Sequence, residues 1–123
     1  MKLQVAQTEG QNTVTAYGDG YVSVNAVRYS NNLVVLPDRL ITEWTTASFD
    51  ALDVADFELL ATLDTEIILL GTGNQLRFPR PELLQPLIKA QKGLEVMDIQ
   101  AACRTYNVLI GEGRKVAAAL IFC

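Results

Sequence analysis

From residue 65 to residue 122, short apolar runs alternate with segments of helical period. Ile67–Leu70 is continuously apolar and ends at a glycine, which is typical of a central strand buried on both faces. Leu94–Met97 and Val116–Phe122 are two further predicted strands. The order strand, helix, strand, helix, strand with tight connections predicts a parallel sheet with right-handed crossovers.

Two helices are predicted between these strands. Pro81 suits the first turn of the earlier helix, Gly93 suits a left-handed stop after it, and an apolar stripe lies between them: Leu83, Leu84, Leu87 and Ile88. Asp98 can cap the later helix, which Gly111 ends. Its apolar positions have the clearest helical period in the chain: Ile99, Ala102, Cys103, Tyr106, Leu109 and Ile110.

The first half has the pattern of an antiparallel meander. Runs rich in β-branched and aromatic residues predict five strands: Thr13–Tyr17, Tyr21–Val24, Ala26–Tyr29, Leu33–Leu36 and Ile41–Thr45. Between the runs lie residues that tolerate positive φ, namely Gly18, Gly20, Asn31 and Asn32. Asp53 can cap a short helix from Val54 to Ala61. We expect burial of the aromatic side chains in this half, including Trp44, in preference to an exposed patch.

Together these patterns predict an α/β fold of the mixed α+β type. N-terminal antiparallel strands join a C-terminal βαβαβ unit, and helices flank a mixed central sheet. No linker or internal repeat interrupts the chain, so residues 1–123 are expected to form a single domain.

Composition and charge limit the range of functions and locations that the chain can have. Residues 1–64 carry 3 basic and 9 acidic groups and residues 65–123 carry 7 and 5, so no basic run favours nucleic acid. Neither a leader segment nor a membrane-spanning run is visible. Two cysteines without a CxxC motif indicate a reducing compartment, and we expect a cytoplasmic protein. The oligomeric state is open.

The loop after Ile67–Leu70 is the first candidate ligand site. Gly71, Thr72 and Gly73 follow a buried strand, where nearby helix amides could hold an anion, with Arg77 and Asp98 as further contacts. The loop lacks the third glycine of a dinucleotide fingerprint and the lysine of a P-loop. A tight turn that needs glycine is therefore the favoured interpretation, and ligand contact is the alternative.

A second candidate surface combines Asn107, Glu112 and Arg114. The last two could act as acid and electrostatic clamp, or could form an ion pair that fixes a connection. If the last three strands are parallel, this surface lies at the opposite end of the sheet from Gly71–Gly73. With no histidine and no clustered cysteines, no catalytic residue, metal site or cofactor is predicted. Cys103 is expected to be a small buried residue.

Four elements of the second half carry a family resemblance: Ile67–Gly73 with Pro79, Gly93–Asp98, Ala101–Leu109 and Glu112–Leu120. They resemble a family of small domains of unknown function whose eukaryotic relatives include a mitochondrial respiratory complex I assembly factor and an adipogenesis-associated protein. The resemblance implies a compact β/α fold with a mixed central sheet and a second small antiparallel layer. It implies no reaction. The chain departs from the family at Ile99, where relatives usually place threonine.

The leading functional hypothesis is therefore a non-enzymatic binding or assembly-type protein that recognises another protein. An enzyme is the less favoured class, because the commonest catalytic groups are missing. The alternative from a different class is a binder or enzyme for a small anionic metabolite or nucleotide that uses a pocket near Gly71–Gly73.

Overall fold

A computed structural model describes residues 10–122 of the chain. The predicted absence of a leader segment, the residue Cys123 and the outer limits of the predicted domain 1–123 lie outside this range. The elements in order are β1 (Val14–Gly18), β2 (Tyr21–Val24), β3 (Val27–Tyr29), β4 (Leu33–Leu36), β5 (Arg39–Ile41), η1 (Phe49–Ala51), α1 (Val54–Ala61), β6 (Ile67–Gly71), η2 (Pro81–Leu84), α2 (Gln85–Lys89), β7 (Gly93–Met97), α3 (Ile99–Gly111) and β8 (Val116–Leu120).

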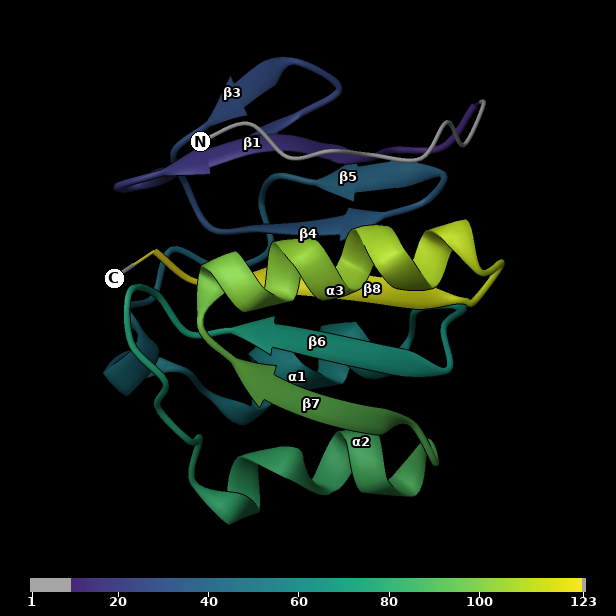
Figure 1. The fold of residues 1–123 in the computed structure, drawn as a ribbon. Coiled ribbons are helices and arrows are strands. Elements are labelled where there is room, and N and C mark those ends of the chain that lie inside the picture. The colour runs from purple at the N-terminus through teal and green to yellow at the C-terminus, as the bar shows by residue number, and fades with distance from the viewer. Residues whose placement is uncertain (1–9, 123) are drawn as a thin grey trace.

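The central sheet has the strand order β5-β4-β8-β6-β7 (Figure 1). β6 pairs with β7 and with β8 in parallel, so the predicted parallel unit is confirmed. β4 pairs antiparallel with β8 and with β5, which makes the sheet mixed, as expected. The carboxyl ends of β6, β7 and β8 therefore lie at one edge of the sheet, together with the start of β4.

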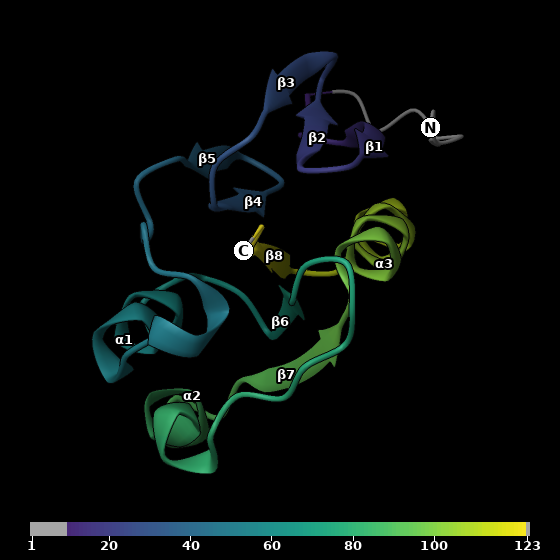
Figure 2. The same cartoon turned by 90° about the vertical axis from the view of Figure 1, so that its left-hand side faces the viewer.

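Helices cover both faces of this sheet. Figure 2 shows α3 on one face and α1 with α2 on the other. Alternate residues of the central strands enter two separate cores: Leu69 and Ala118 pack with α3, whereas Ile68 and Ala117 pack with α1 and α2. β8 is buried at every position. An apolar run without alternation therefore marks a strand covered on both sides.

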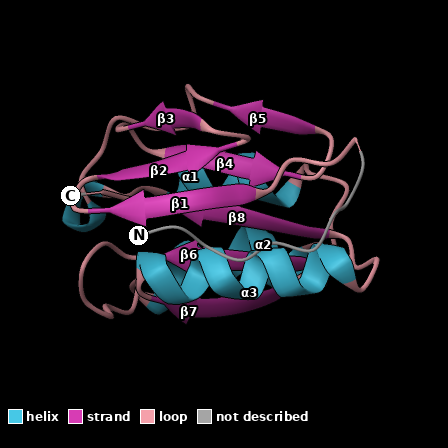
Figure 3. Ribbon diagram, turned by 45° about the horizontal axis from the view of Figure 1, so that its top comes forward, coloured by secondary structure: helices cyan, strands magenta, loops and turns pink. Residues whose placement is uncertain are grey.

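A second sheet, β1-β2-β3, lies beside α3 over the same face (Figure 3). Its side chains Val14, Tyr17, Val22 and Val24 join the α3 core. The β2–β3 hairpin turns at Asn25 and Ala26, whose φ angles of 51° and 68° are those of a type I′ turn. The prediction that Asn31 and Asn32 reverse the chain with positive φ was wrong, because residues 30–32 cross from the small sheet to the central one.

The predicted strand Ile41–Thr45 was also wrong. β5 spans Arg39–Ile41, and the chain then leaves the sheet so that Trp44 enters the core beside α1. The indole Nε1 donates a hydrogen bond to Asp56 O at 2.9 Å, which fixes this position. Burial of Trp44, expected from its size, is confirmed at 5% exposure. Burial of a large aromatic ring overrides the strand propensity of its neighbours.

The predicted helix after Pro81 is split. Residues 81–84 form a 3-10 turn, which advances three residues per turn and shifts the phase of the stripe. Leu83 and Leu87 are buried, but Ile88 is 61% exposed, contrary to prediction. The left-handed residue after α2 is Gln91, with φ 57°, whereas Gly93 begins β7. No helix within residues 10–122 is long and apolar enough to cross a membrane.

Candidate functional site

The fold brings the first candidate site together at the carboxyl edge of the parallel strands. Gly71 ends β6, and Asp98 follows β7 as the N-cap of α3. Thr72 N donates to Met97 O at 2.9 Å, and Ile99 N donates to Gly73 O at 3.0 Å. The loop after β6 is thus bonded directly to the start of α3, and the predicted proximity of Gly71–Gly73 and Asp98 is present.

Thr72 is the centre of this loop. It is one of three buried polar residues in the described part of the chain. Its hydroxyl donates to Gln75 O at 2.8 Å and accepts from Arg77 N at 3.0 Å. Its carbonyl oxygen accepts from Nε and Nη2 of Arg77 at 3.2 and 2.8 Å. The buried hydroxyl is therefore used to close the loop upon itself.

The charged groups of this loop also have internal roles. The Arg77 guanidinium lies over the Phe49 ring, 4.6 Å from its centroid. Asp98 Oδ1 accepts from Ala101 N at 2.8 Å, so its carboxylate occupies the N-terminus of α3. A helix start attracts anions through its free amides, but here Asp98 supplies the negative charge itself. The contacts favour a structural role for Arg77 and Asp98.

The two glycines of the loop are required for different reasons. A Cβ on Gly71 would lie 2.9 Å from Leu120 Cδ2 and 3.2 Å from Ala102 Cβ, so this glycine lets α3 pack closely on the sheet. Gly73 has φ 88°, a conformation that side chains rarely adopt, and a Cβ there would meet Arg77 Nη2 at 3.1 Å. Both observations agree with the tight-turn interpretation. Ligand contact by Gly71, Thr72, Gly73, Arg77 and Asp98 stays a prediction.

Beyond Arg77 the same loop exposes apolar side chains. Leu76 is 51% exposed and Phe78 is 71% exposed, the largest exposure among the large hydrophobic residues described. Arg77 between them is anchored to Thr72 and Phe49. We call residues 74–80 the apolar loop. The side chains of Leu76 and Phe78 are exposed in this loop, while the hydrogen bonds of Arg77 to Thr72 fix the centre of its backbone.

The second candidate surface separates into two parts. Asn107 faces β1: its Oδ1 accepts from Val14 N at 3.0 Å, and its Nδ2 donates to Val14 O at 2.8 Å. Glu112 and Arg114 are exposed, and the structure describes no ion pair between them. They lie at the end of the sheet opposite Gly71–Gly73, as the parallel order predicts. Asn107 therefore joins two layers and does not line a surface with Glu112.

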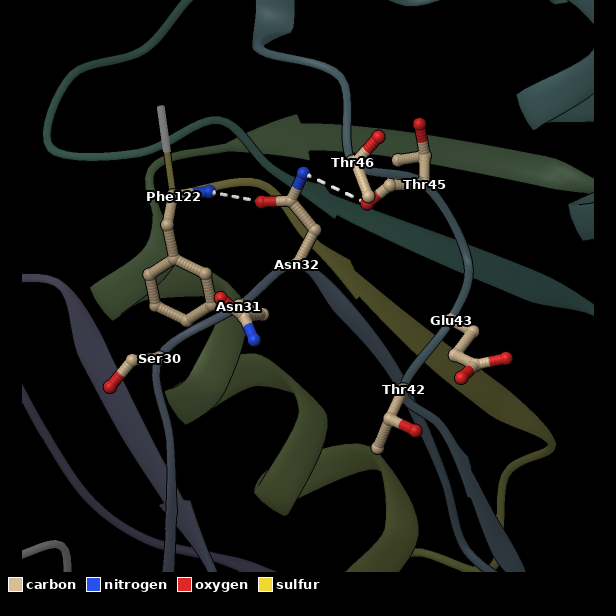
Figure 4. A pocket seen from close by; sticks show the side chains of 8 residues that line it. All are labelled: Ser30, Asn31, Asn32, Thr42, Glu43, Thr45, Thr46 and Phe122. Atoms are coloured by element: carbon tan, nitrogen blue, oxygen red, sulfur yellow. Dashed lines mark hydrogen bonds between the residues drawn. The ribbon is translucent and has the colours of Figure 1, made fainter.

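Sequence reasoning missed a pocket of about 700 Å³ at the start of β4. It is formed by three segments: the β3–β4 connection, the chain after β5, and Phe122, which lies two residues beyond the end of β8 (Figure 4). The lining residues are Ser30, Asn31, Asn32, Thr42, Glu43, Thr45, Thr46 and Phe122. A smaller hollow of about 180 Å³ adjoins it and adds Arg28, Tyr29 and Leu33.

Asn32 holds the three walls of this pocket together. It is 7% exposed, its Nδ2 donates to Thr45 O at 3.3 Å and to Ala47 O at 2.8 Å, and its Oδ1 accepts from Phe122 N at 2.8 Å. In sequence, Asn32 gave a signal as a polar residue directly before the buried strand Leu33–Leu36. Asn32 was assigned to a turn, because its hydrogen-bond partners lie elsewhere in the chain and the sequence does not show them.

Cys103 and Tyr106 are buried titratable groups that lie outside these candidate sites. Cys103 is fully buried, as expected, and burial raises the pKa of its thiol to about 12 despite the opposing charge of Arg104. Burial likewise raises the pKa of Tyr106, whose hydroxyl donates to Asn12 O at 2.9 Å. Within residues 10–122, His, Cys, Asp and Glu form no group that could hold a metal ion. Neither buried group is suited to nucleophilic attack at neutral pH.

Comparison with protein families assigns residues 14–121 to a model described as "Protein of unknown function (DUF498/DUF598)". A crystal structure of a Bordetella parapertussis protein is similar, with a TM-score of 0.85 and 38% identity over 95% of this chain and all of that chain. The fold and the resemblance inferred from sequence are thus confirmed.

Two named relatives differ in what their names say. The mouse protein called NADH dehydrogenase (ubiquinone) 1 alpha subcomplex assembly factor 3 is 32% identical over 98% of this chain and 66% of its own length. A Francisella tularensis protein called 13 kDa major membrane protein is 26% identical over 98% of this chain and 99% of its own. The chain thus spans about two thirds of the mouse assembly factor.

Proposed function

The chain belongs to the DUF498/DUF598 family of unknown function, and from that membership we propose that it is a non-enzymatic, assembly-type protein that recognises another protein. The mouse relative that is named as an assembly factor supports a role of this class. A cytoplasmic location is part of the proposal. Because the Francisella relative is named as a membrane protein, fractionation of native cells into soluble and membrane pools is the test of location.

The observation that carries the proposal is the apolar loop. Phenylalanine and other aromatic residues are enriched in the cores of protein interfaces. Phe78 and Leu76 are exposed at 71% and 51%, two positions apart. The bonds from Arg77 to Thr72 hold the loop before any partner arrives. Less conformational entropy is then lost on binding, which favours recognition.

The test compares three baits in affinity enrichment from native lysate. The wild-type chain is compared with the double variant Leu76→Ser, Phe78→Ser and with Val108→Ser. Val108 is 59% exposed on α3, so its variant is a control for loss of an exposed apolar side chain elsewhere. Hot-spot truncation typically costs at least about 2 kcal/mol, so we expect more than about tenfold loss of the partner with the double variant.

The control variant should retain the partner at the wild-type level. A purified partner then permits a direct Kd for each variant. The proposal is overturned if no protein is enriched by the wild-type chain, or if the double variant captures the same proteins equally well.

The alternative function, binding of a small anionic metabolite or nucleotide near Gly71–Gly73, has one observation in its favour. The loop lies at the carboxyl edge of parallel strands, where open α/β sheets commonly bind ligands. It ranks second because Arg77 already donates to Thr72 and Asp98 already fills the helix start. A thermal shift with ATP or phosphate that disappears in Arg77→Ala supports it, and the absence of any shift refutes it.

A further inference from the structure

We propose that the pocket around Asn32 binds a neutral, polyhydroxylated small molecule, a sugar or a glycoside. None of its lining residues belongs to the apolar loop, so this inference goes beyond the proposed recognition of a protein. A volume of about 700 Å³ falls within the range of roughly 300–1,000 Å³ typical of small-molecule sites.

The pocket is formed before a ligand enters. Asn32 bonds to Thr45 and Ala47 on one side and to Phe122 on the other, with distances of 3.3, 2.8 and 2.8 Å. Phe122 lies 90 residues from Asn32 in the sequence, whereas Thr45 and Ala47 lie 13 and 15 residues away. A site whose walls are joined by buried hydrogen bonds loses little entropy when a ligand binds.

Several polar groups of the lining are free to bind a ligand. In the described part of the chain, no hydrogen bond is made by the side chains of Ser30, Asn31, Thr42 and Thr46, while Asn32 has its bonds inside the protein. Hydroxyl and carboxamide groups both donate and accept. A ligand whose own hydroxyls donate and accept can satisfy them in any of several orientations. This property distinguishes a polyol from a ligand that only accepts hydrogen bonds.

Charge argues against an anionic ligand. Glu43 is the only ionisable residue among the eight that line the pocket, and it is acidic. The cation of the adjoining hollow, Arg28, lies over the Tyr21 ring at 3.8 Å from its centroid. A phosphate or carboxylate would meet the Glu43 charge without a cation among the lining residues. Neighbouring hydroxyls of a sugar can instead donate to both carboxylate oxygens, and such charge-assisted bonds are strong.

Phe122 supplies the apolar part of the site. Its ring is half-buried and lines the pocket beside Ser30 and Asn31, while Thr42 and Glu43 lie on the other side (Figure 4). The C–H face of a pyranose is apolar whereas its rim carries hydroxyls. An aromatic wall opposite a polar wall matches these two parts of one ligand.

The test is a ¹H–¹⁵N NMR titration of the full chain with glucose, galactose and maltose, at concentrations around a Kd of about 1 mM. Glucose 6-phosphate and glucosamine provide an anionic and a cationic counterpart. We expect saturable shifts at the amides of Asn31, Asn32, Phe122 and residues 42–46 with at least one neutral sugar. Glu43→Gln and Asn31→Ala should each raise the Kd by about tenfold.

Glu112→Gln is the matched control, since Glu112 is exposed at the opposite end of the sheet. It should leave the Kd unchanged. The proposal is overturned by any of three results: no saturable shift with a neutral sugar, tighter binding of glucose 6-phosphate or glucosamine than of every neutral sugar, or shifts confined to residues 71–77.

Discussion

The carboxamide of Asn107 makes both of its hydrogen bonds to Val14, accepting from its N–H at 3.0 Å and donating to its C=O at 2.8 Å. Val14 lies 93 residues earlier in the chain, on β1. A helix side chain thereby takes the place of a neighbouring strand and attaches the small sheet to α3.

Replacement of Asn107 by aspartate tests this attachment. Asn107→Asp keeps the acceptor for Val14 N–H but removes the donor and sets a carboxylate against the carbonyl oxygen of Val14. We expect a loss of about 1–3 kcal/mol in the free energy of unfolding, measured with urea. Asn31→Asp is the control, because Asn31 is exposed and forms no such bond, and it should change stability by less than about 0.5 kcal/mol. Equal stability of the two variants would contradict the assigned role.

Two glycine-to-alanine substitutions should have opposite effects. In Gly71→Ala the new methyl group meets Leu120 and Ala102 at 2.9 and 3.2 Å, and overpacking should cost about 1–3 kcal/mol. Gly111, the last residue of α3, has open space around it, so Gly111→Ala should stabilise by about 0.4–1 kcal/mol. Urea midpoints of the two variants check the prediction. A Gly71→Ala variant as stable as wild type would refute the close packing of α3 on the sheet.

Arg77 should be structural even though it is partly exposed. Arg77→Ala removes two bonds to Thr72 O and the contact with Phe49, so a loss of about 1–3 kcal/mol is expected, with faster amide hydrogen exchange in residues 74–80. Arg80→Ala is the control. Its ion pair with Glu82, at 3.7 Å, is exposed and should contribute at most about 1 kcal/mol. Unchanged exchange in Arg77→Ala would show that the apolar loop is held by other contacts.

The titration of Cys103 should lower the free energy of unfolding at high pH. Burial raises the pKa of its thiol from 9.0 to about 12, so the folded protein keeps the proton while the unfolded chain loses it. The stabilisation is complete below pH 9 and is lost between pH 9 and about 12. Per pH unit in this window, wild type should lose about 1.4 kcal/mol relative to Cys103→Ala. Urea unfolding of both proteins at about pH 8 and about pH 10 measures the difference, and a difference independent of pH contradicts the prediction.

The candidate sites show where sequence reasoning succeeds and where it fails. That Gly71–Gly73 and Asp98 meet at one edge was predictable, because parallel order alone places both after strands. The bonding of Arg77 to its own loop was not predictable, since it depends on the Phe49 ring and on the carbonyl oxygen of Thr72. Asn107 was grouped with Glu112 in one candidate surface, and only the docking of β1 determines the face to which it belongs.

The sequence by itself determined the order of strands and helices in the second half, although not the 3-10 turn of residues 81–84. An apolar run without alternation and an apolar stripe of helical period each have one stable environment. Only the tertiary structure decided which strand ends and loops come together to form a pocket. Asn32 and Phe122 are 90 residues apart, and their hydrogen bond at 2.8 Å closes the pocket. No local pattern specifies such a contact, since it depends on the antiparallel register of β4 with β8, which sets Leu33 opposite Leu120 and brings the flanking residues together.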